Sequence, residues 1–296
     1  MPNISYACGT SDEPLFGITI GERFDETVLQ YPNNEALIVP HQNIRWTYLE
    51  VQEQVNTCAK SLLSLGIERG DRVGIWSTNC AEWYVLQFAS AKVGAILVNI
   101  NPSYRLHEVE YALNQSQCKL IVIADRFKSS NYTEMIQELA PELPYTSLMD
   151  LEADRLPHLK TVVSLADTPP EGMISWPEFL LRSEAIAPDD VDERMATLSF
   201  DDPINIQYTS GTTGHPKGAT LSHHNILNNS YFALKCMEFT DKDRLVVPLP
   251  LYHCFGMVLG NLGCVNHGAT VIYPSESFDA LAVLTAVEKE KGTVLY

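Results

Sequence analysis

The stretch that decides the fold is Thr209-Ser210-Gly211-Thr212-Thr213-Gly214-His215-Pro216-Lys217-Gly218. Its hydroxyl groups can donate to phosphate oxygens, and its glycines allow successive backbone N–H groups to turn toward one anion. Lys217 adds a positive charge. An ordinary surface turn does not need four hydroxyls, two spaced glycines, a proline and a lysine within one such run. The stretch therefore predicts a loop that binds the phosphates of ATP.

The flanking sequence places this loop at the end of a strand. Upstream, Ile204-Asn205-Ile206-Gln207-Tyr208 alternates apolar and polar side chains, as a strand does. Downstream, Ser222 can cap a helix that carries Ile226, Leu227 and Leu234 on one face. The loop is not a Walker A motif, because Lys217 is followed by glycine and not by serine or threonine. A different class of nucleotide-binding protein is indicated.

In these residues the chain resembles the adenylate-forming, or AMP-binding, superfamily, which includes acyl-CoA synthetases, luciferases and the adenylation domains of peptide synthetases. Tyr208 to Thr220 is similar to its signature loop, and the likeness covers nearly the whole chain. The stretches 202–207 and 218–223 are most similar to medium-chain acyl-CoA synthetases of the family member 2 type. The other landmarks that resemble the superfamily are Arg45-Trp46-Thr47-Tyr48, Gly70-Asp71-Arg72-Val73, Val93-Gly94-Ala95, Asn101-Pro102 and Pro250-Leu251-Tyr252-His253.

Helical and strand patterns alternate along the chain, which predicts an α/β fold with a mainly parallel sheet. The best marked helix begins with the capping box Thr47/Glu50 and closes at Gly66. The resemblance implies the large N-terminal domain of the adenylate-forming fold, with mainly parallel sheets flanked by helices. The expected strands are 72–76, 95–98, 119–123, 161–165, 204–208, 245–247 and 270–273, and the other expected helices are 79–92, 106–114, 135–139, 255–265 and 278–290.

We predict a first α/β subdomain over 1–167, a proline-rich and acidic connector over 168–201, and a second α/β segment with the phosphate-binding loop over 202–296. The alternating pattern stops within a buried strand at 293–296, so we expect a fold that is incomplete at its C-terminus. The resemblance implies that the later acidic motif, the hinge and a small C-terminal lid domain with a catalytic lysine are absent. Activity of this chain alone is therefore not expected.

The resemblance implies fatty acid–CoA ligase chemistry: a carboxylate attacks ATP to give an acyl-adenylate, and coenzyme A then displaces AMP. It implies that Lys217 and His253 are the catalytic residues, with Mg²⁺ on Thr213. Lys217 would offset charge on the departing pyrophosphate, and His253 would orient the acyl carboxylate or gate the acyl tunnel. The residues expected to bind ATP are Thr209, Ser210, Gly211, Thr212, Thr213, Gly214, His215, Pro216 and Lys217.

His253 has a structural alternative, because a single histidine among Leu251, Tyr252 and Phe255 is more often a packed core residue. Cys254 beside it is a weak candidate for thiol chemistry, since adjacent residues seldom face each other. Gly256, Gly260, Gly263 and Gly268 leave either room for an acyl tunnel or close helix packing. His223 and His224 are expected at a helix start, without a catalytic role.

The composition narrows the classes of partner. A formal charge of -17 repels nucleic acid and anionic membranes. No apolar run approaches the roughly twenty residues that cross a bilayer, and the first 16 residues resemble neither a secretion signal nor a mitochondrial transit peptide. The seven cysteines form no Cys-x-x-Cys pair, which favours a reducing compartment. We expect small-molecule partners, a mitochondrial location if an upstream transit peptide is missing and a cytoplasmic one otherwise.

Three functional alternatives stay open at this point. The first is an acyl-CoA synthetase that uses ATP, Mg²⁺ and coenzyme A. The second is another adenylate-forming enzyme that accepts an aryl or amino acid. The third is a non-catalytic, truncated product that binds nucleotide or pairs with intact enzyme as a regulator. Self-association into a homo-oligomer is compatible with each of them.

Overall fold

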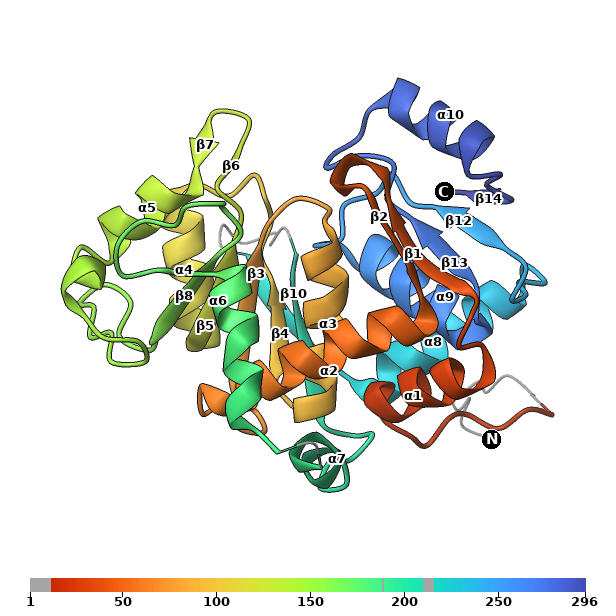
Figure 1. The fold of residues 1–296 in the computed structure, drawn as a ribbon, viewed down its shortest axis with the longest axis horizontal. Helices are drawn as coiled ribbons and strands as arrows, with labels where there is room; N and C mark the ends of the chain where they lie inside the picture. Colours follow the sequence, from red (N-terminus) through yellow and green to blue (C-terminus); the bar gives the residue numbers. More distant parts are fainter. Residues whose placement is uncertain (1–11, 188, 210–215) are drawn as a thin grey trace, which may run out of the picture.

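Two sheets with helices packed on their faces make up the fold (Figure 1). The structure is a computed structural model that describes residues 12–187, 189–209 and 216–296. The larger sheet has the strand order β11-β10-β4-β3-β5-β8-β9 and the smaller sheet has the order β14-β12-β13-β1-β2. Among the described residues of these two sheets, the pairings β10–β11 and β1–β2 are antiparallel and the others are parallel. The predicted class of mainly parallel sheets flanked by helices is confirmed.

The strands of the larger sheet are β3 (Arg72–Trp76), β4 (Ile96–Asn99), β5 (Cys118–Ile123), β8 (Thr161–Ser164), β9 (Ile174–Ser175), β10 (Pro203–Thr209) and β11 (Lys217–Ser222). The strands of the smaller sheet are β1 (Glu35–Val39), β2 (Ile44–Thr47), β12 (Arg244–Val246), β13 (Thr270–Ile272) and β14 (Val294–Leu295). A separate hairpin consists of β6 (Arg126–Phe127) and β7 (Ser130–Asn131).

The α-helices are α1 (Ile20–Gln30), α2 (Tyr48–Ser64), α3 (Ala81–Val93), α4 (Leu106–Ser116), α5 (Tyr132–Leu139), α6 (Trp176–Leu181), α7 (Asp190–Met195), α8 (His223–Lys235), α9 (Gly263–His267) and α10 (Ala280–Lys289). The predicted capping box at the start of α2 is present, with the Thr47 hydroxyl accepting from the Glu50 N–H and the Glu50 carboxylate accepting from the Thr47 N–H. The 3₁₀ turns are η1 (Pro40–Gln42), η2 (Leu143–Tyr145) and η3 (Arg182–Ala185).

Each expected strand and helix has a counterpart within a few residues, but three features differ from the expectation. The predicted helix over 255–265 begins as the π-helix η4 (Phe255–Leu262) and continues as α9. The sequence after the phosphate-binding loop first forms β11, and only then the helix capped by Ser222. The predicted connector contains β9 and the short helices α6 and α7. The elements within the connector are too short to show a periodic pattern in the sequence.

Both sheets combine strands from the two sides of the predicted connector. β10 and β11 extend the larger sheet beside β4, whereas β1 and β2 join the smaller sheet beside β13. Ranges 1–167 and 202–296 therefore share both sheets, and their division stays a prediction about folding units.

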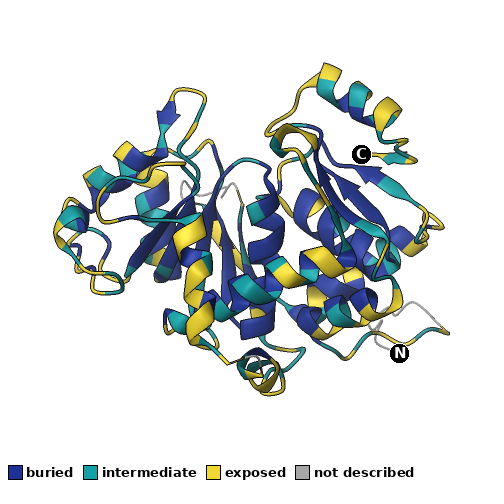
Figure 2. Ribbon diagram, in the orientation of Figure 1, coloured by how far each residue is buried: buried dark blue, intermediate teal, exposed yellow. Residues whose placement is uncertain are grey.

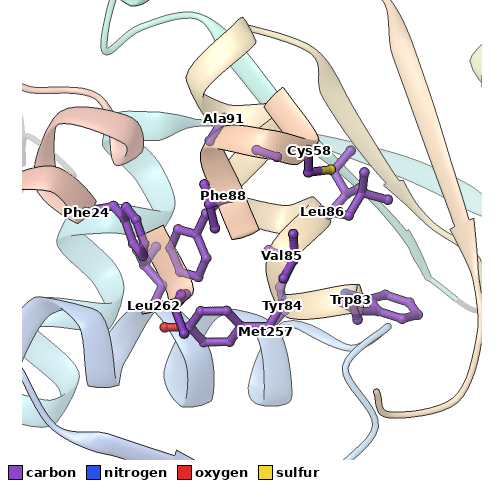
Figure 3. Close-up of a cluster of buried hydrophobic side chains, with 14 of the residues drawn as sticks. Phe24, Cys58, Trp83, Tyr84, Val85, Leu86, Phe88, Ala91, Met257 and Leu262 are labelled. Atoms are coloured by element: carbon purple, nitrogen blue, oxygen red, sulfur yellow. The ribbon is translucent and has the colours of Figure 1, made fainter. Parts of the chain in front are cut away.

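Helix α3 lies in the middle of the molecule and is buried around its whole circumference (Figure 2). A helix can be apolar on all sides only where other elements cover every face. Figure 3 shows how this is achieved: Phe24 of α1, Cys58 of α2 and Leu262 of η4 surround Phe88 and its neighbours on α3. The Phe24 and Phe88 rings stack with centroids 4.9 Å apart. One continuous hydrophobic cluster therefore includes residues of α1, α2, α3 and η4. It fixes η4 in place against these helices.

Candidate active site

The described base of the predicted ATP-binding loop is the open end of the β10–β11 hairpin. Thr209 is paired with Lys217 in the antiparallel register, and the Thr209 hydroxyl lies 3.5 Å from the Lys217 carbonyl oxygen. Because β10 runs parallel to β4, the loop leaves at the carboxyl edge of the sheet. In open α/β sheets, this edge is where ligands bind.

The structure locates three of the predicted loop residues. Thr209 and Lys217 are exposed and Pro216 is half-buried. Ser210, Gly211, Thr212, Thr213, Gly214 and His215 lie outside the described residues, and with them the predicted magnesium ligand Thr213.

Lys217 is a cation at the described end of the loop, and it is exposed. No ion pair links its ammonium group to any residue in the described ranges. An exposed, unpaired lysine at the end of a hairpin fits a phosphate chain, because its charge is not already neutralised by a carboxylate. Within the same ranges no three His, Cys, Asp or Glu side chains gather as a metal site.

His253 lies on the segment that connects β12 with η4. Its Nδ1 accepts a hydrogen bond from the backbone N–H of Phe255 at 3.1 Å, and its backbone carbonyl accepts from the N–H of Met257 at 3.1 Å. An Nδ1 that accepts must be unprotonated, which assigns the proton of the neutral ring to Nε2. The ring is exposed. His253 can therefore present an N–H donor to a carboxylate, and it is not the packed core residue of the structural alternative.

The glycines near His253 serve close packing. A Cβ atom at Gly256 would lie 2.7 Å from the Pro250 carbonyl oxygen, and one at Gly263 would lie 2.6 Å from Leu234 Cδ2. At Gly260 the nearest atom would be 3.2 Å away on Val247. These contacts favour close helix packing over the tunnel alternative. Cys254 is exposed, and its sulfur lies 3.9 Å from His253 Nδ1, an atom that already accepts from Phe255.

Asn79 joins the carboxyl edges of the two sheets. Its Nδ2 donates to the Leu249 carbonyl oxygen, and its Oδ1 accepts from the Leu251 N–H, both at 2.9 Å. Its backbone N–H donates to the Glu276 carbonyl oxygen at 3.0 Å. The side chain thus pairs with the segment before His253 as a neighbouring strand would. Asn79 follows β3 in the larger sheet, whereas the segment follows β12 in the smaller one.

A cavity of about 210 Å³ lies between these edges, beside Tyr252. Its lining combines rings of proline and phenylalanine with a few polar groups, a mixture typical of small-molecule sites. The lining residues are Thr78, Asn79, Asn101, Pro102, Ser103, Phe127, Pro248, Pro250, Tyr252, Glu276, Ser277 and Phe278.

The inner end of the β10–β11 hairpin is anchored in the core through His223, the first residue of α8. His223 is fully buried, and its Nδ1 accepts from the Ile20 N–H at 3.0 Å. Burial lowers the pKa of His223 to about 4, because the charged ring would lose its hydration. Beside it, burial acts to raise the pKa of Asp202, but the Ser199 N–H and the Arg69 guanidinium outweigh this and hold the pKa below its ordinary value.

Sequence reasoning did not identify the amides that hold the site. The alternation of apolar and polar side chains located β10, but it did not show that the polar Asn205 and Gln207 are buried, at 1% and 8% exposed. η4 covers the face of β10 that carries them, and Asn99 at the end of β4 lies under the same cover. Amide side chains at the ends of neighbouring parallel strands were the signal available in the sequence.

The chain matches the AMP-binding enzyme family over residues 24–296. The chain belongs to this family. Among curated proteins it is 42% identical over 304 residues to the mitochondrial medium-chain acyl-CoA ligase ACSF2 of Rattus norvegicus, a match that covers 99% of this chain and 48% of the relative. It is 41% identical over 282 residues to YngI of Bacillus subtilis, covering 95% of this chain and 51% of YngI. The resemblance to acyl-CoA synthetases of the ACSF2 type is thus confirmed.

Solved structures give the same fold. The N-terminal domain of FACL13 from Mycobacterium tuberculosis, solved with an inhibitor bound, matches with a TM-score of 0.75 and 26% identity over 94% of this chain and 62% of that one. The anthranilate CoA ligase AuaEII in complex with anthranoyl-AMP matches with a TM-score of 0.79 and 23% identity, over 98% of this chain and 51% of that one. The second likeness shows the fold alone.

The chain spans about half the length of the curated relatives it matches. The described helices include none that is both long and apolar enough to cross a bilayer.

Proposed function

We propose that the chain carries the ATP- and acid-binding part of an acyl-CoA synthetase, which forms an acyl-adenylate from ATP and a fatty acid before coenzyme A takes the acyl group. The observation that carries this proposal is the position of the predicted loop. Thr209 and Lys217 close it at the carboxyl edge of the larger sheet, and the sequence between them resembles the signature loop of the family that the chain matches over residues 24–296. A medium-chain acid is the proposed substrate, because the ACSF2 relatives have that activity in their names.

Lys217 is proposed to bind the β- and γ-phosphates, where its charge offsets the charge that develops on the departing pyrophosphate. Preorganised cations of this kind stabilise the transition state because they need no rearrangement when the charge appears. Thr209 adds a hydroxyl donor at the start of the loop. Mg²⁺ would supply further charge compensation, with the Thr213 hydroxyl as the proposed ligand.

His253 is proposed to orient the acid. Its Nε2–H can donate to one carboxylate oxygen and leave the other free to attack the α-phosphate. The hydrogen bond from Phe255 to Nδ1 fixes the tautomer, so that the donor is present before the acid arrives. The ring therefore positions the acid and takes no proton from it.

Two further parts of the proposal come from the relatives. Coenzyme A is the proposed acceptor of the acyl group. A mitochondrial location is proposed from the names of the ACSF2 relatives, with a cytoplasmic one as the alternative.

The test is calorimetric titration of the full chain with MgATP and then with octanoate, followed by ATP–pyrophosphate exchange. We expect MgATP binding that is weakened by Lys217→Ala, and octanoate binding that is weakened by His253→Ala. Benzoate and anthranilate are the comparison acids, and a preference for either would replace the fatty acid by an aryl acid. Exchange by this chain alone is not expected. Binding of MgATP without binding of octanoate or of either comparison acid would favour the non-catalytic alternative, and no binding at all would refute the proposal.

A further inference from the structure

Three buried amide side chains form a chain of hydrogen bonds beneath the candidate site. Gln207 Nε2 donates to Asn205 Oδ1 at 2.9 Å, and Asn205 Nδ2 donates to Asn99 Oδ1 at 3.1 Å and to the Leu97 carbonyl oxygen at 2.9 Å. The parallel register of β10 and β4 places Asn205 opposite Leu97, and Gln207 opposite Asn99. We call Gln207, Asn205 and Asn99 the amide chain. It crosses from β10 to β4 in the interior.

The amide chain ends on the segment that carries His253. Asn99 Nδ2 donates to the Tyr252 carbonyl oxygen at 3.4 Å and lies 3.1 Å from Met257 Sδ. Tyr252 immediately precedes His253 in sequence, and the Met257 N–H donates to the His253 carbonyl oxygen. Gln207 Nε2 also lies 3.8 Å from Met257 Sδ, so the amide chain contacts the backbone before His253 and the Met257 side chain after it.

The other end of the amide chain lies next to the loop. Gln207 is two residues before Thr209, whose pairing with Lys217 closes the loop. Burial of an amide without partners is costly, so every member needs the next one. Apolar side chains would pack the same interface without the cost of burying amides. They would not fix how β10, β4 and the segment that carries His253 are oriented relative to one another. Directional hydrogen bonds run from β10 through Asn99 to the Tyr252 carbonyl oxygen, and so connect the β10–β11 hairpin with the residue before His253.

We infer that Asn99 is a positioning residue, which acts through Tyr252 and Met257 to couple the position of His253 to the hairpin that carries the loop. The inference deepens the proposed function and rests on it for its catalytic meaning. The mechanical coupling itself belongs to the ligand-free chain. Removal of one member should therefore loosen the element at the other end.

The test is amide hydrogen exchange, measured by NMR on the ligand-free full chain. In Gln207→Met, a change on β10, we expect exchange of the Gly256 and Met257 amides to rise about tenfold, since one broken link costs roughly one hydrogen bond. In Asn99→Leu, a change on β4, we expect the same rise at the Thr209–Lys217 pair as well. Unchanged exchange at Gly256 and Met257 in Gln207→Met would overturn the inference, and this variant decides alone if Asn99→Leu does not fold.

Asn266→Leu is the matched control. Asn266 is also a buried amide, 3% exposed, and its Nδ2 donates to the Leu227 carbonyl oxygen and the Ser230 hydroxyl between α8 and α9. Its removal should cost a similar amount of stability and leave exchange at Gly256 and Met257 within about threefold of the wild type, after correction for the change in global unfolding free energy. An equal rise in this control would show a merely structural role and overturn the inference.

A second readout uses the His253 ring. If the proposed function holds, MgATP shifts the ring Cε1–H resonance in the wild type, and Asn99→Leu loses at least half of that shift while the Kd for MgATP changes less than about threefold. A full shift in Asn99→Leu would overturn the inference. Absence of MgATP binding in the wild type would refute the proposed function, and the exchange experiment would then decide the inference by itself.

Discussion

The two parts of the candidate site are held in opposite ways. The open end of the β10–β11 hairpin is exposed, with Lys217 to Thr220 in contact with solvent, and among the described strands β11 pairs with β10 alone. The segment around η4 is buried from Gly256 to Val258, follows β12 of the smaller sheet, and is tied to the larger sheet by Asn79 and Asn99. One part lies at a sheet edge and the other lies in the core.

The difference separates the two roles that the site must fill. A polyphosphate is large and charged, so a hairpin that reaches into solvent can meet it with N–H groups, hydroxyls and Lys217. A carboxylate must be aimed at one phosphorus atom, which needs a donor whose position is fixed by packing. We therefore expect substitutions in the hairpin to change binding at little cost in stability, and substitutions around η4 to change stability first.

The largest effect should come from Gly256→Ala. The new methyl group would meet the Pro250 carbonyl oxygen at 2.7 Å, a backbone atom that cannot move aside easily. We expect a loss of about 3 kcal/mol in the free energy of unfolding, measured by urea denaturation.

Gly218→Ala in β11 is the matched substitution in the hairpin. There the nearest atom is Ile206 Cγ2 at 3.0 Å, the end of a side chain that can adjust. A loss below about 1 kcal/mol is expected. Equal losses of unfolding free energy in Gly256→Ala and Gly218→Ala would contradict the proposed difference between the η4 segment and the hairpin.

The free energy of unfolding should depend on pH through His223, at the inner end of the β10–β11 hairpin. The pKa of His223 falls from 6.5 to about 4 on folding, so the unfolded chain binds more protons between these values. The stabilising contribution of the neutral ring is complete above pH 6.5 and is lost as pH falls toward 4. We expect the unfolding free energy to fall by about 2 kcal/mol between pH 7 and 5.

The control for this prediction is His223→Gln, which should flatten most of that slope. His267, whose pKa burial also lowers, accounts for the part that remains. A slope unchanged in His223→Gln would show that His223 is not the group that titrates.

Lys217→Ala should weaken MgATP binding by about tenfold, equivalent to about 1.4 kcal/mol, because one full charge next to the phosphates is lost. The unfolding free energy should stay within about 0.5 kcal/mol, since the side chain is exposed. Lys242→Ala provides a control of equal charge. Lys242 is exposed and precedes β12, so it lies at the opposite end of that strand from the segment that carries His253. Equal weakening by both variants would indicate general electrostatics instead of a site.

The smallest effect is expected for Thr209→Val, which removes one hydroxyl and keeps the shape. One hydrogen bond from an uncharged, solvent-exposed donor contributes about 1 kcal/mol, so MgATP affinity should fall about threefold to fivefold. Isothermal titration of this variant beside the wild type measures the change. A loss larger than that of Lys217→Ala would reverse the ranking of charge over hydroxyl.

The sequence predicted elements whose signals are local, and it missed features that depend on contacts with distant segments. The periodic segments that became α2 and β10 were located correctly because their signals are local. β11 was missed because exposed residues on both faces give no alternation. The burial of Asn205 and Gln207 depends on η4, which comes some fifty residues later in the chain. Contacts of that range leave no local pattern.

The central claim is that the polyphosphate binds at the loop between Thr209 and Lys217. Its most direct test is paramagnetic broadening of backbone amide resonances by MnATP, with MgATP as the diamagnetic reference. The account predicts the strongest broadening at Thr209 and Lys217, weaker broadening at His253, and none along α10. Broadening centred on any other surface, with the resonances of Thr209 and Lys217 unaffected, would contradict it.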